Sequence, residues 1–249
     1  MIHPLHTFCF AELYTPDVAG AKKFYGDLFG WTMDDRSGMY SIFQKDGQDV
    51  VALRRSDAGE SLWVNHVAVE SVDRSAARVR QLGGRVIMPP FDTPGVARTA
   101  VVASPEGAIF GLWEARGVAG AAIQDKTGSM WWVEVAMADR MTARPFYVDL
   151  FGWTFVETLR YEMPSPYTVF KAGDVSAAGG TQIERDWGIA PVWWVTFAID
   201  DYSTVIRRAE ELGGEQRFNR EVPETGRLAM LIDPSDAAFS VMHPKVIAA

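Results

Sequence analysis

The balance of 48% hydrophobic and 22% charged residues over 249 positions excludes a disordered or fibrous protein. The net charge of −8 argues against a nucleic-acid partner, because a phosphate backbone would repel it. No apolar run approaches the roughly 18 residues of a membrane span, and the first residues lack the basic and apolar regions of a signal peptide, so we expect a cytoplasmic protein without a membrane partner.

Residues 7–14 form the first predicted strand, because apolar and polar side chains alternate along it. The alternation places Cys9, the single cysteine, in the core as an inert thiol and excludes an internal disulfide. A helix is predicted to start after Thr15-Pro16-Asp17 and to end at Gly30. Further strands are expected near Trp31, at 40–44 and at 50–54, the last two joined around Asp46-Gly47.

The same order of elements follows in the next segment of the chain. A strand at 63–70 precedes a helix at 73–82, which Gly83-Gly84 ends, and strands are predicted at 97–103 and 108–114. Residues 115–129 are rich in Gly and Ala and are predicted to be a linker.

The sequence FYGDLFGW at 24–31 returns as FYVDLFGW at 146–153, with seven of eight residues identical. Leu82-Gly83-Gly84 likewise returns as Leu212-Gly213-Gly214. The repeat predicts two domains, 5–117 and 127–246, each built from two βαβββ modules. Which modules pair with each other stays open. Pro145 falls inside the helix of the third module and is predicted to kink or shorten it.

Four such modules, the doubled FYxxLFGW, the doubled LGG and EGAIFGLW at 106–113 together resemble the vicinal oxygen chelate superfamily. That group includes glyoxalases, bleomycin-resistance proteins, extradiol dioxygenases and fosfomycin-resistance enzymes. The resemblance covers nearly the whole chain. It implies an α+β fold of two glyoxalase/bleomycin-resistance-like domains, whose mixed half-barrel sheets curl around a cavity.

Members of this family that use a metal hold it with His, Glu or Gln on the first and last strands of the modules. The matching first-strand positions here are Phe10, Val64, Trp132 and Trp194, none of which can bind a metal. Gly111 and Ser240 stand where a last-strand glutamate would be expected. We therefore predict that the usual metal site is absent and that the protein has no tightly bound cofactor.

A row of polar residues lies two positions further along the same first strands, at Glu12, His66, Glu134 and Thr196. Period-two alternation puts these residues on the face that carries the metal positions. Glu12 and His66 are therefore the predicted catalytic pair, able to transfer a proton or to bind a divalent ion weakly. The alternative is structural, with a hydrogen-bonded buried carboxylate and a core histidine.

Aromatic residues are predicted to line the cavity around these polar groups. The predicted ligand-binding residues are Phe8, Phe10, Tyr14, Tyr40 and Trp113 in the first half, and Trp132, Glu134, Trp194 and Thr196 in the second. Aromatic walls with few polar anchors are typical of a pocket for a flat or apolar molecule. The alternative is that the indoles only fill the barrel. Arg98 and Arg227 could clamp an anion, although an arginine on an edge strand is more often structural.

Two functions follow as hypotheses. The first is a protein of the bleomycin-resistance kind that binds a small aromatic or apolar molecule without a metal, as a monomer or homodimer. The second is a lyase or dioxygenase-type enzyme that uses Glu12 and His66 as a displaced site. A third interpretation is that one half is a degenerate scaffold for the other.

Overall fold

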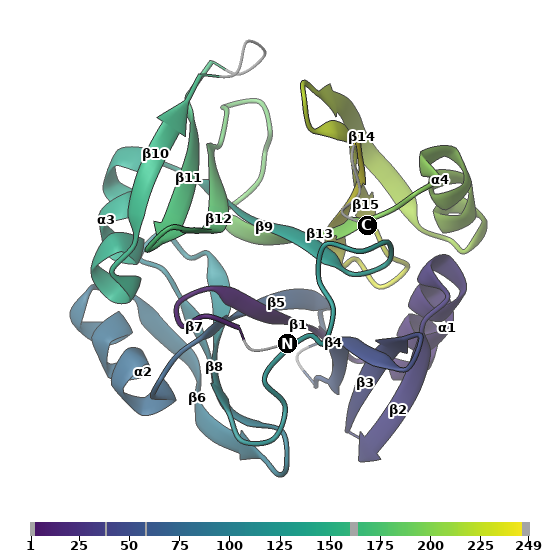
Figure 1. Cartoon of the computed structure of the whole chain (residues 1–249), viewed down its shortest axis with the longest axis horizontal. Coiled ribbons are helices and arrows are strands. Elements are labelled where there is room, and N and C mark those ends of the chain that lie inside the picture. The colour runs from purple at the N-terminus through teal and green to yellow at the C-terminus, as the bar shows by residue number, and fades with distance from the viewer. Residues whose placement is uncertain (1–2, 38, 58, 160–163, 246–249) are drawn as a thin grey trace. The chain divides into compact units, whose positions relative to one another are not determined.

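The computed structural model describes residues 3–37, 39–57, 59–159 and 164–245 (Figure 1). The first module comprises β1 (Phe8–Thr15), α1 (Val18–Phe29), β2 (Thr32–Ser37), β3 (Tyr40–Lys45) and β4 (Gln48–Arg55). The second comprises β5 (Leu62–Ala68), α2 (Val72–Gln81), β6 (Arg85–Thr93), β7 (Ala97–Ala103) and β8 (Ile109–Ala115).

The third and fourth modules repeat this order. The third comprises β9 (Met130–Met137), α3 (Arg140–Phe151), β10 (Thr154–Thr158), β11 (Tyr167–Ala172) and β12 (Val175–Gln182). The fourth comprises β13 (Val192–Ala198), α4 (Tyr202–Glu211), β14 (Glu215–Val222), β15 (Gly226–Ile232) and β16 (Ala238–Pro244). The predicted βαβββ repeat is confirmed in all four modules.

Two mixed sheets of eight strands contain these elements. One has the order β2-β3-β4-β1-β5-β8-β7-β6 and the other β10-β11-β12-β9-β13-β16-β15-β14. The first strand of each module pairs in parallel with the last, as β1 does with β4 and β13 with β16, while the other pairs within each module are antiparallel. The α+β fold class predicted from the sequence is confirmed.

Short polar residues and glycines set the ends of the helices. Asp17 and Asp139 accept backbone N–H groups at the starts of α1 and α3, and Gly30 and Gly152 end these helices at φ of 70° and 68°. Pro145 was predicted to kink or shorten α3; the shortening is wrong, since α3 is twelve residues long, as α1 is, and the kink stays a prediction. We attribute the persistence of α3 to the burial of its aromatic face, which offsets the hydrogen bond that a proline cannot donate.

By compactness the chain divides into two units that do not follow the two sequence halves. Unit 1 comprises the described residues of Met1–Cys9, Val64–Gly120 and Val133–Trp193. Unit 2 comprises those of Phe10–Trp63, Ala121–Trp132 and Trp194–Ala249. Each unit therefore combines one module from each half of the chain. The domains at 5–117 and 127–246 stay a prediction.

Unit 2 has an aromatic core in which α1 packs on β13 and β16. Phe29 of α1 lies 5.3 Å from Phe197 and Tyr25 lies 5.5 Å from Phe239, between ring centroids. Tyr25 Oη donates to Asp233 and accepts a hydrogen bond from Trp63 Nε1, at 2.9 and 3.0 Å. Figure 1 shows α1 and α4, which are far apart in the sequence, side by side in this unit. The FYxxLFGW motif of α1 therefore serves the core.

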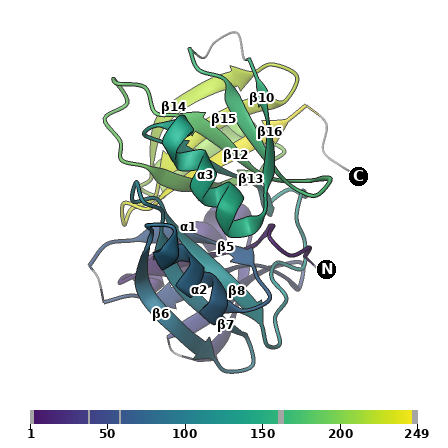
Figure 2. The same ribbon diagram turned by 90° about the vertical axis from the view of Figure 1, so that its left-hand side faces the viewer.

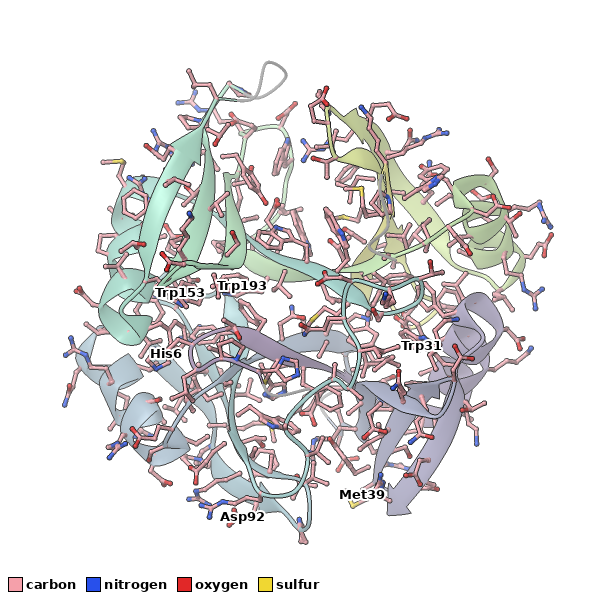
Figure 3. All side chains as sticks on the ribbon, in the orientation of Figure 1. His6, Trp31, Met39, Asp92, Trp153 and Trp193 are labelled. Carbon is pink, nitrogen blue, oxygen red and sulfur yellow. The ribbon has the colours of Figure 1, made fainter. Side chains whose placement is uncertain are left out.

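Unit 1 has an equivalent core, in which the second copy of the motif packs on β13 and β8. Tyr147 of α3 lies 5.2 Å from Trp193 and 6.1 Å from Phe110, between ring centroids. Trp153 Nε1 donates to the carbonyl of His6 at 2.7 Å, and Figure 3 shows these two residues close to Trp193. Figure 2 shows α2 crossing β6, β7 and β8, with α3 beside it.

Candidate functional site

Glu12 lies on β1 in unit 2, and its side chain is fully buried. Tyr14 Oη donates to Glu12 Oε2 at 3.0 Å, and Arg54 Nη2 donates to Glu12 Oε1 at 3.4 Å. The strand register produces this cluster, because Tyr14 stands opposite Arg54 on β4, and Arg54 stands opposite Tyr40 on β3. The buried carboxylate thus has a cation and a hydroxyl donor in the same apolar sheet.

Burial and charge fix the ionisation of the groups around Glu12. Burial and the Glu12 carboxylate raise the pKa of Tyr14 well above its usual value, and the pKa of Tyr40 is raised by the same two effects. For Arg54, burial is the largest single effect and lowers the pKa, but the Glu12 carboxylate and the Tyr14 and Tyr40 hydroxyls together outweigh it, so the pKa is raised. The Arg54 guanidinium also lies 4.5 Å from the centroid of the Tyr40 ring. The cluster therefore keeps its cation and its phenol protons.

His66 lies on β5 in unit 1 and is fully buried. It stands opposite Gly111 on β8, where a Cβ atom would come within 2.0 Å of His66 Nδ1. The edge of the imidazole faces Trp113, with 5.3 Å between ring centroids. The imidazole thus occupies the space that a side chain at Gly111 would need, which explains a glycine at this last-strand position.

The two predicted catalytic residues fall in different compact units, so their proximity stays a prediction. Both carboxylate oxygens of Glu12 already accept hydrogen bonds, and an ion at Glu12 would compete with the Arg54 guanidinium. Within the described part of the chain, no three His, Cys, Asp or Glu side chains gather to hold a metal ion. The residues at the family's metal positions therefore do not fit that metal site.

Glu134 on β9 is the counterpart of Glu12 in the second half and has different surroundings. It is half-buried, and Tyr167 Oη donates to its Oε2 at 2.6 Å within unit 1. The positions that match Tyr14 and Arg54 hold Ala136 and Thr181, which stand opposite each other on β9 and β12. A tyrosine donates to the carboxylate in each copy, from β1 at Tyr14 and from β11 at Tyr167, and the arginine is replaced by Thr181.

Exposure differs sharply between the two halves at the matched positions. Phe10, Glu12 and His66 are 0% exposed, and Val64 is 1% exposed. Their counterparts Trp132, Glu134 and Trp194 are half-buried, and only Thr196, at 5%, is buried. The predicted ligand-binding residues of the second half are therefore more open to a small molecule.

The sheet of the fourth module in unit 2 has one face covered by α1 and one face turned away from it. Phe197 and Phe239 belong to the covered face, because both contact α1. Side chains alternate along strands, so Thr196 and Ser240, which stand opposite each other, belong to the other face. We call this the helix-free face. It continues through Met230, opposite Ser240, to Phe218, opposite Met230, and Trp194 reaches it from β13.

The remaining predicted wall residues lie in several environments. Phe8 packs on Trp193 and Trp153 in the core of unit 1, with ring centroids 4.9 and 6.4 Å apart. Phe10, Tyr14, Tyr40 and Trp113 are buried. Sequence reasoning missed Arg54, although an arginine ending the apolar run at 50–54 was a signal.

Arg98 and Arg227 both have structural roles. Arg98 donates to both carboxylate oxygens of Asp73, at 2.7 and 2.9 Å, and to Asp92 at 2.9 Å. These residues line a shallow surface depression of about 420 Å³. The Arg227 guanidinium lies 3.9 Å from the centroid of the Tyr202 ring. The structural interpretation of both arginines is favoured.

The sequence model of the Glyoxalase/Bleomycin resistance protein/Dioxygenase superfamily matches residues 5–133. The chain belongs to this superfamily. The anthracycline biosynthesis protein DauV of Streptomyces sp. (strain C5) is 34% identical over 252 residues, covering 93% of this chain and 91% of the relative. A putative glyoxylase, CFP32 of Mycobacterium tuberculosis (strain CDC 1551 / Oshkosh), is 34% identical over 244 residues, covering 94% and 93%.

Solved structures of the same superfamily share the fold. The Mn(II)-bound glyoxalase of Novosphingobium aromaticivorans aligns with a TM-score of 0.64 and 17% identity, over 98% of this chain and 86% of that one. A variant of homoprotocatechuate 2,3-dioxygenase from B.fuscum aligns with a TM-score of 0.68 and 16% identity, over 98% and 73%. At this identity the likeness supports the fold alone. No helix among the described residues is long and apolar enough to cross a membrane.

Proposed function

We propose that this protein binds a flat, largely apolar small molecule on the helix-free face, without the metal ion used by other members of the superfamily. The observation that carries the proposal is a contrast in exposure between matched positions. Trp132 and Trp194 are half-buried, whereas their first-half counterparts Phe10 and Val64 are fully buried. A binding site must leave its walls accessible, and a packed core does not.

The chemistry of this face suits a planar ligand. Trp132 and Trp194 lie on β9 and β13, which are neighbours in the sheet, and both belong to unit 2. Indole faces stack on flat rings, while Thr196 and Ser240, which are 5% and 3% exposed, would offer their hydroxyls only from the buried floor of this face. Two relatives are named for anthracycline biosynthesis, and anthracyclines are planar, fused-ring aromatic molecules. Fused aromatic rings are therefore the proposed ligand class.

Calorimetric titration of the full chain with naphthalene and anthraquinone derivatives tests this proposal. We expect Trp194→Ala to weaken binding at least tenfold, about the loss typical of a buried aromatic contact. Trp131→Ala is the matched control, because Trp131 is equally half-buried but points to the opposite side of β9 from Trp132. Equal affinities for the parent and Trp194→Ala would refute the proposal.

A second candidate function, an enzyme centred on Glu12 and His66, is favoured by one observation. A fully buried carboxylate in an apolar sheet costs stability unless it is compensated, and Arg54 and Tyr14 supply that compensation. In this proposal Glu12 relays a proton to or from a bound dicarbonyl compound. Glu12→Gln and His66→Asn should each abolish turnover in chelator-treated protein, measured well below the unfolding midpoint of each variant, because Glu12→Gln also leaves the Arg54 guanidinium without its carboxylate. Turnover that survives both changes rules the pair out.

A further inference from the structure

We propose that unit 1 contains a binding site for a phenol, at the place in the third module where the first module buries the side chain of Tyr14. We call it the phenol site. Its residues all belong to unit 1 and are Glu134, Ala136, Tyr167, Val169 and Thr181. It shares no residue with the helix-free face of the fourth module, so this inference goes beyond the proposed function and does not rest on it.

Phe170 and Gly180 identify the face of the third module's sheet that α3 covers. Phe170 lies 5.8 Å from Tyr147 of α3 between ring centroids, and a Cβ atom at Gly180 would come within 3.1 Å of Phe170 Cε2. Figure 1 shows α3 alongside β10 and β11. Side chains alternate along β12, so Thr181, the residue after Gly180, points to the face that α3 does not cover.

The third module lacks the two large side chains that fill this place in the first. Ala136 matches Tyr14 and Thr181 matches Arg54, and the two residues of each module stand opposite each other on parallel strands. In the first module the Tyr14 phenol donates to the buried carboxylate two residues before it, at 3.0 Å. A free phenol over Ala136 can take the place of that side chain and donate to Glu134.

Tyr167 does not replace the missing ring. It is the first residue of β11 and matches Tyr40, the first residue of β3, so the first module has this tyrosine in addition to Tyr14. The Tyr167 hydroxyl donates to Glu134 Oε2 at 2.6 Å. A carboxylate has about four lone-pair sites, so Glu134 can accept a further hydroxyl beside that of Tyr167.

The row of residues that crosses the sheet at Glu134 is open, while the matched row of the first module is closed. Glu134 and Val169 are half-buried, and Val156 of β10, which stands opposite Val169, is 47% exposed. The matched residues Glu12 and Ile42 are both 0% exposed. The phenol site can therefore be reached from the side of β10.

Thr181 gives a second, independent indication of a ligand. Its side chain is 1% exposed, and its Oγ1 atom has no hydrogen-bond partner among the described residues. A buried hydroxyl without a partner costs stability, so such a group in a folded protein indicates a bound water or ligand. Thr181 Oγ1 can donate to the oxygen of a phenol that itself donates to Glu134.

The probes p-cresol and 4-fluorotoluene test the site. The first is the tyrosine side chain as a free molecule, and the second has a fluorine that cannot donate a hydrogen bond in place of the hydroxyl. Titration of the full chain followed by nuclear magnetic resonance should show p-cresol binding about tenfold tighter, the value of one hydrogen bond to a charged group.

Three variants locate the bound phenol. Ala136→Tyr restores the side chain of the first module and should abolish p-cresol binding, and Thr181→Val should weaken it about fivefold. Thr168→Val is the matched control. Thr168 is also buried with a hydroxyl that lacks a partner among the described residues, but it stands opposite Gly180 on the face that α3 covers, so its loss should leave the affinity unchanged.

The outcomes separate this site from the proposed aromatic site. Trp194→Ala should leave p-cresol binding unchanged, and a loss of binding would place the phenol on the helix-free face, which overturns this inference and leaves the binding function standing. Absence of p-cresol binding, equal binding of both probes, or an equal loss in Thr181→Val and Thr168→Val also overturns the phenol site. Should Ala136→Tyr fail to fold by circular dichroism, Ala136→Val fills the place in part, and unchanged binding in that variant overturns the site.

Discussion

At the scale of single residues, Arg54 determines whether Glu12 can remain buried. The two side chains are 15% and 0% exposed, and the guanidinium lies 3.4 Å from the carboxylate. Removing one partner of a buried ion pair leaves a charge without compensation, and this is far more costly than losing a surface pair. The stability of the protein should therefore depend on whether Arg54, Glu12 or both are replaced.

We expect Arg54→Met to lower the free energy of unfolding by about 3 kcal/mol, because Glu12 would lose its cation in an apolar sheet. Arg55→Met is the matched control on the same strand, since Arg55 is 56% exposed and pairs only loosely with Asp57, at 3.8 Å. Urea denaturation measures both. The double variant Glu12→Gln with Arg54→Met should recover much of the loss, and no recovery would contradict a coupled pair.

Asp233 should make stability depend on pH. Burial raises the pKa of its carboxyl above the usual 3.8, although Tyr25 and backbone N–H groups donate to it. A raised pKa means that folding favours the protonated form, so this contribution is full below 3.8 and is lost as the pH rises through the folded-state pKa. Asp233→Asn stays neutral, so its melting temperature relative to the parent should rise between pH 4 and pH 7. A constant difference across that range would show that Asp233 does not titrate with folding.

At the scale of elements, the two repeated motifs fit each other. A Cβ atom at Gly84, the last residue of the first LGG, would come within 3.1 Å of Phe146 Cε2, in the second FYxxLFGW. A Cβ atom at Gly214 would come equally close to Phe24 Cε2, in the first. The glycine after one helix therefore makes room for the phenylalanine of the other motif. This explains why both motifs occur twice.

Gly84→Ala should destabilise the protein by about 1 to 3 kcal/mol, as overpacking does. The new methyl group would also lie 2.7 Å from the carbonyl oxygen of Ala103, which belongs to the backbone and cannot rotate away. Gly214→Ala should cost less, since its nearest backbone oxygen is 3.0 Å away. Thermal unfolding of the two variants gives the order, and the reverse order would contradict the dominant role of the Ala103 carbonyl oxygen.

The sequence predicted the elements well and their pairing poorly. Alternation placed the strands that contain Glu12 and His66, and the glycines placed the helix ends, because these signals are local. The partnership of Glu12 with Arg54 depends on register between β1 and β4, 42 positions apart in the chain. The faces of β14 depend on a bulge between Gln216 and Phe218, which breaks the period of two on which sequence interpretation relies. Contacts that depend on how distant strands pair therefore could not be predicted from local sequence patterns.

At the scale of the whole molecule, the duplication does not yield two independent cores. The core of unit 2 combines α1 from the first half with β13 and β16 from the second, and the core of unit 1 combines α3 with β8. The hydrogen bond that Tyr25 of the first half donates to Asp233 of the second half also joins the two halves within unit 2. The core of each unit therefore contains residues from both halves of the chain.

Residues 1–120 and 121–249, produced separately, should each fail to fold as a monomer, because each would expose the aromatic face of its first helix. Refolded together, the two fragments should regain the near-ultraviolet circular dichroism of the intact chain, since mixing restores contacts such as Tyr25 with Asp233 and Phe24 with Gly214. A fragment that folds alone as a homodimer would agree with this exchange, because a second copy can supply the equivalent module. A fragment that unfolds cooperatively as a monomer would contradict it and would restore the two halves as independent domains.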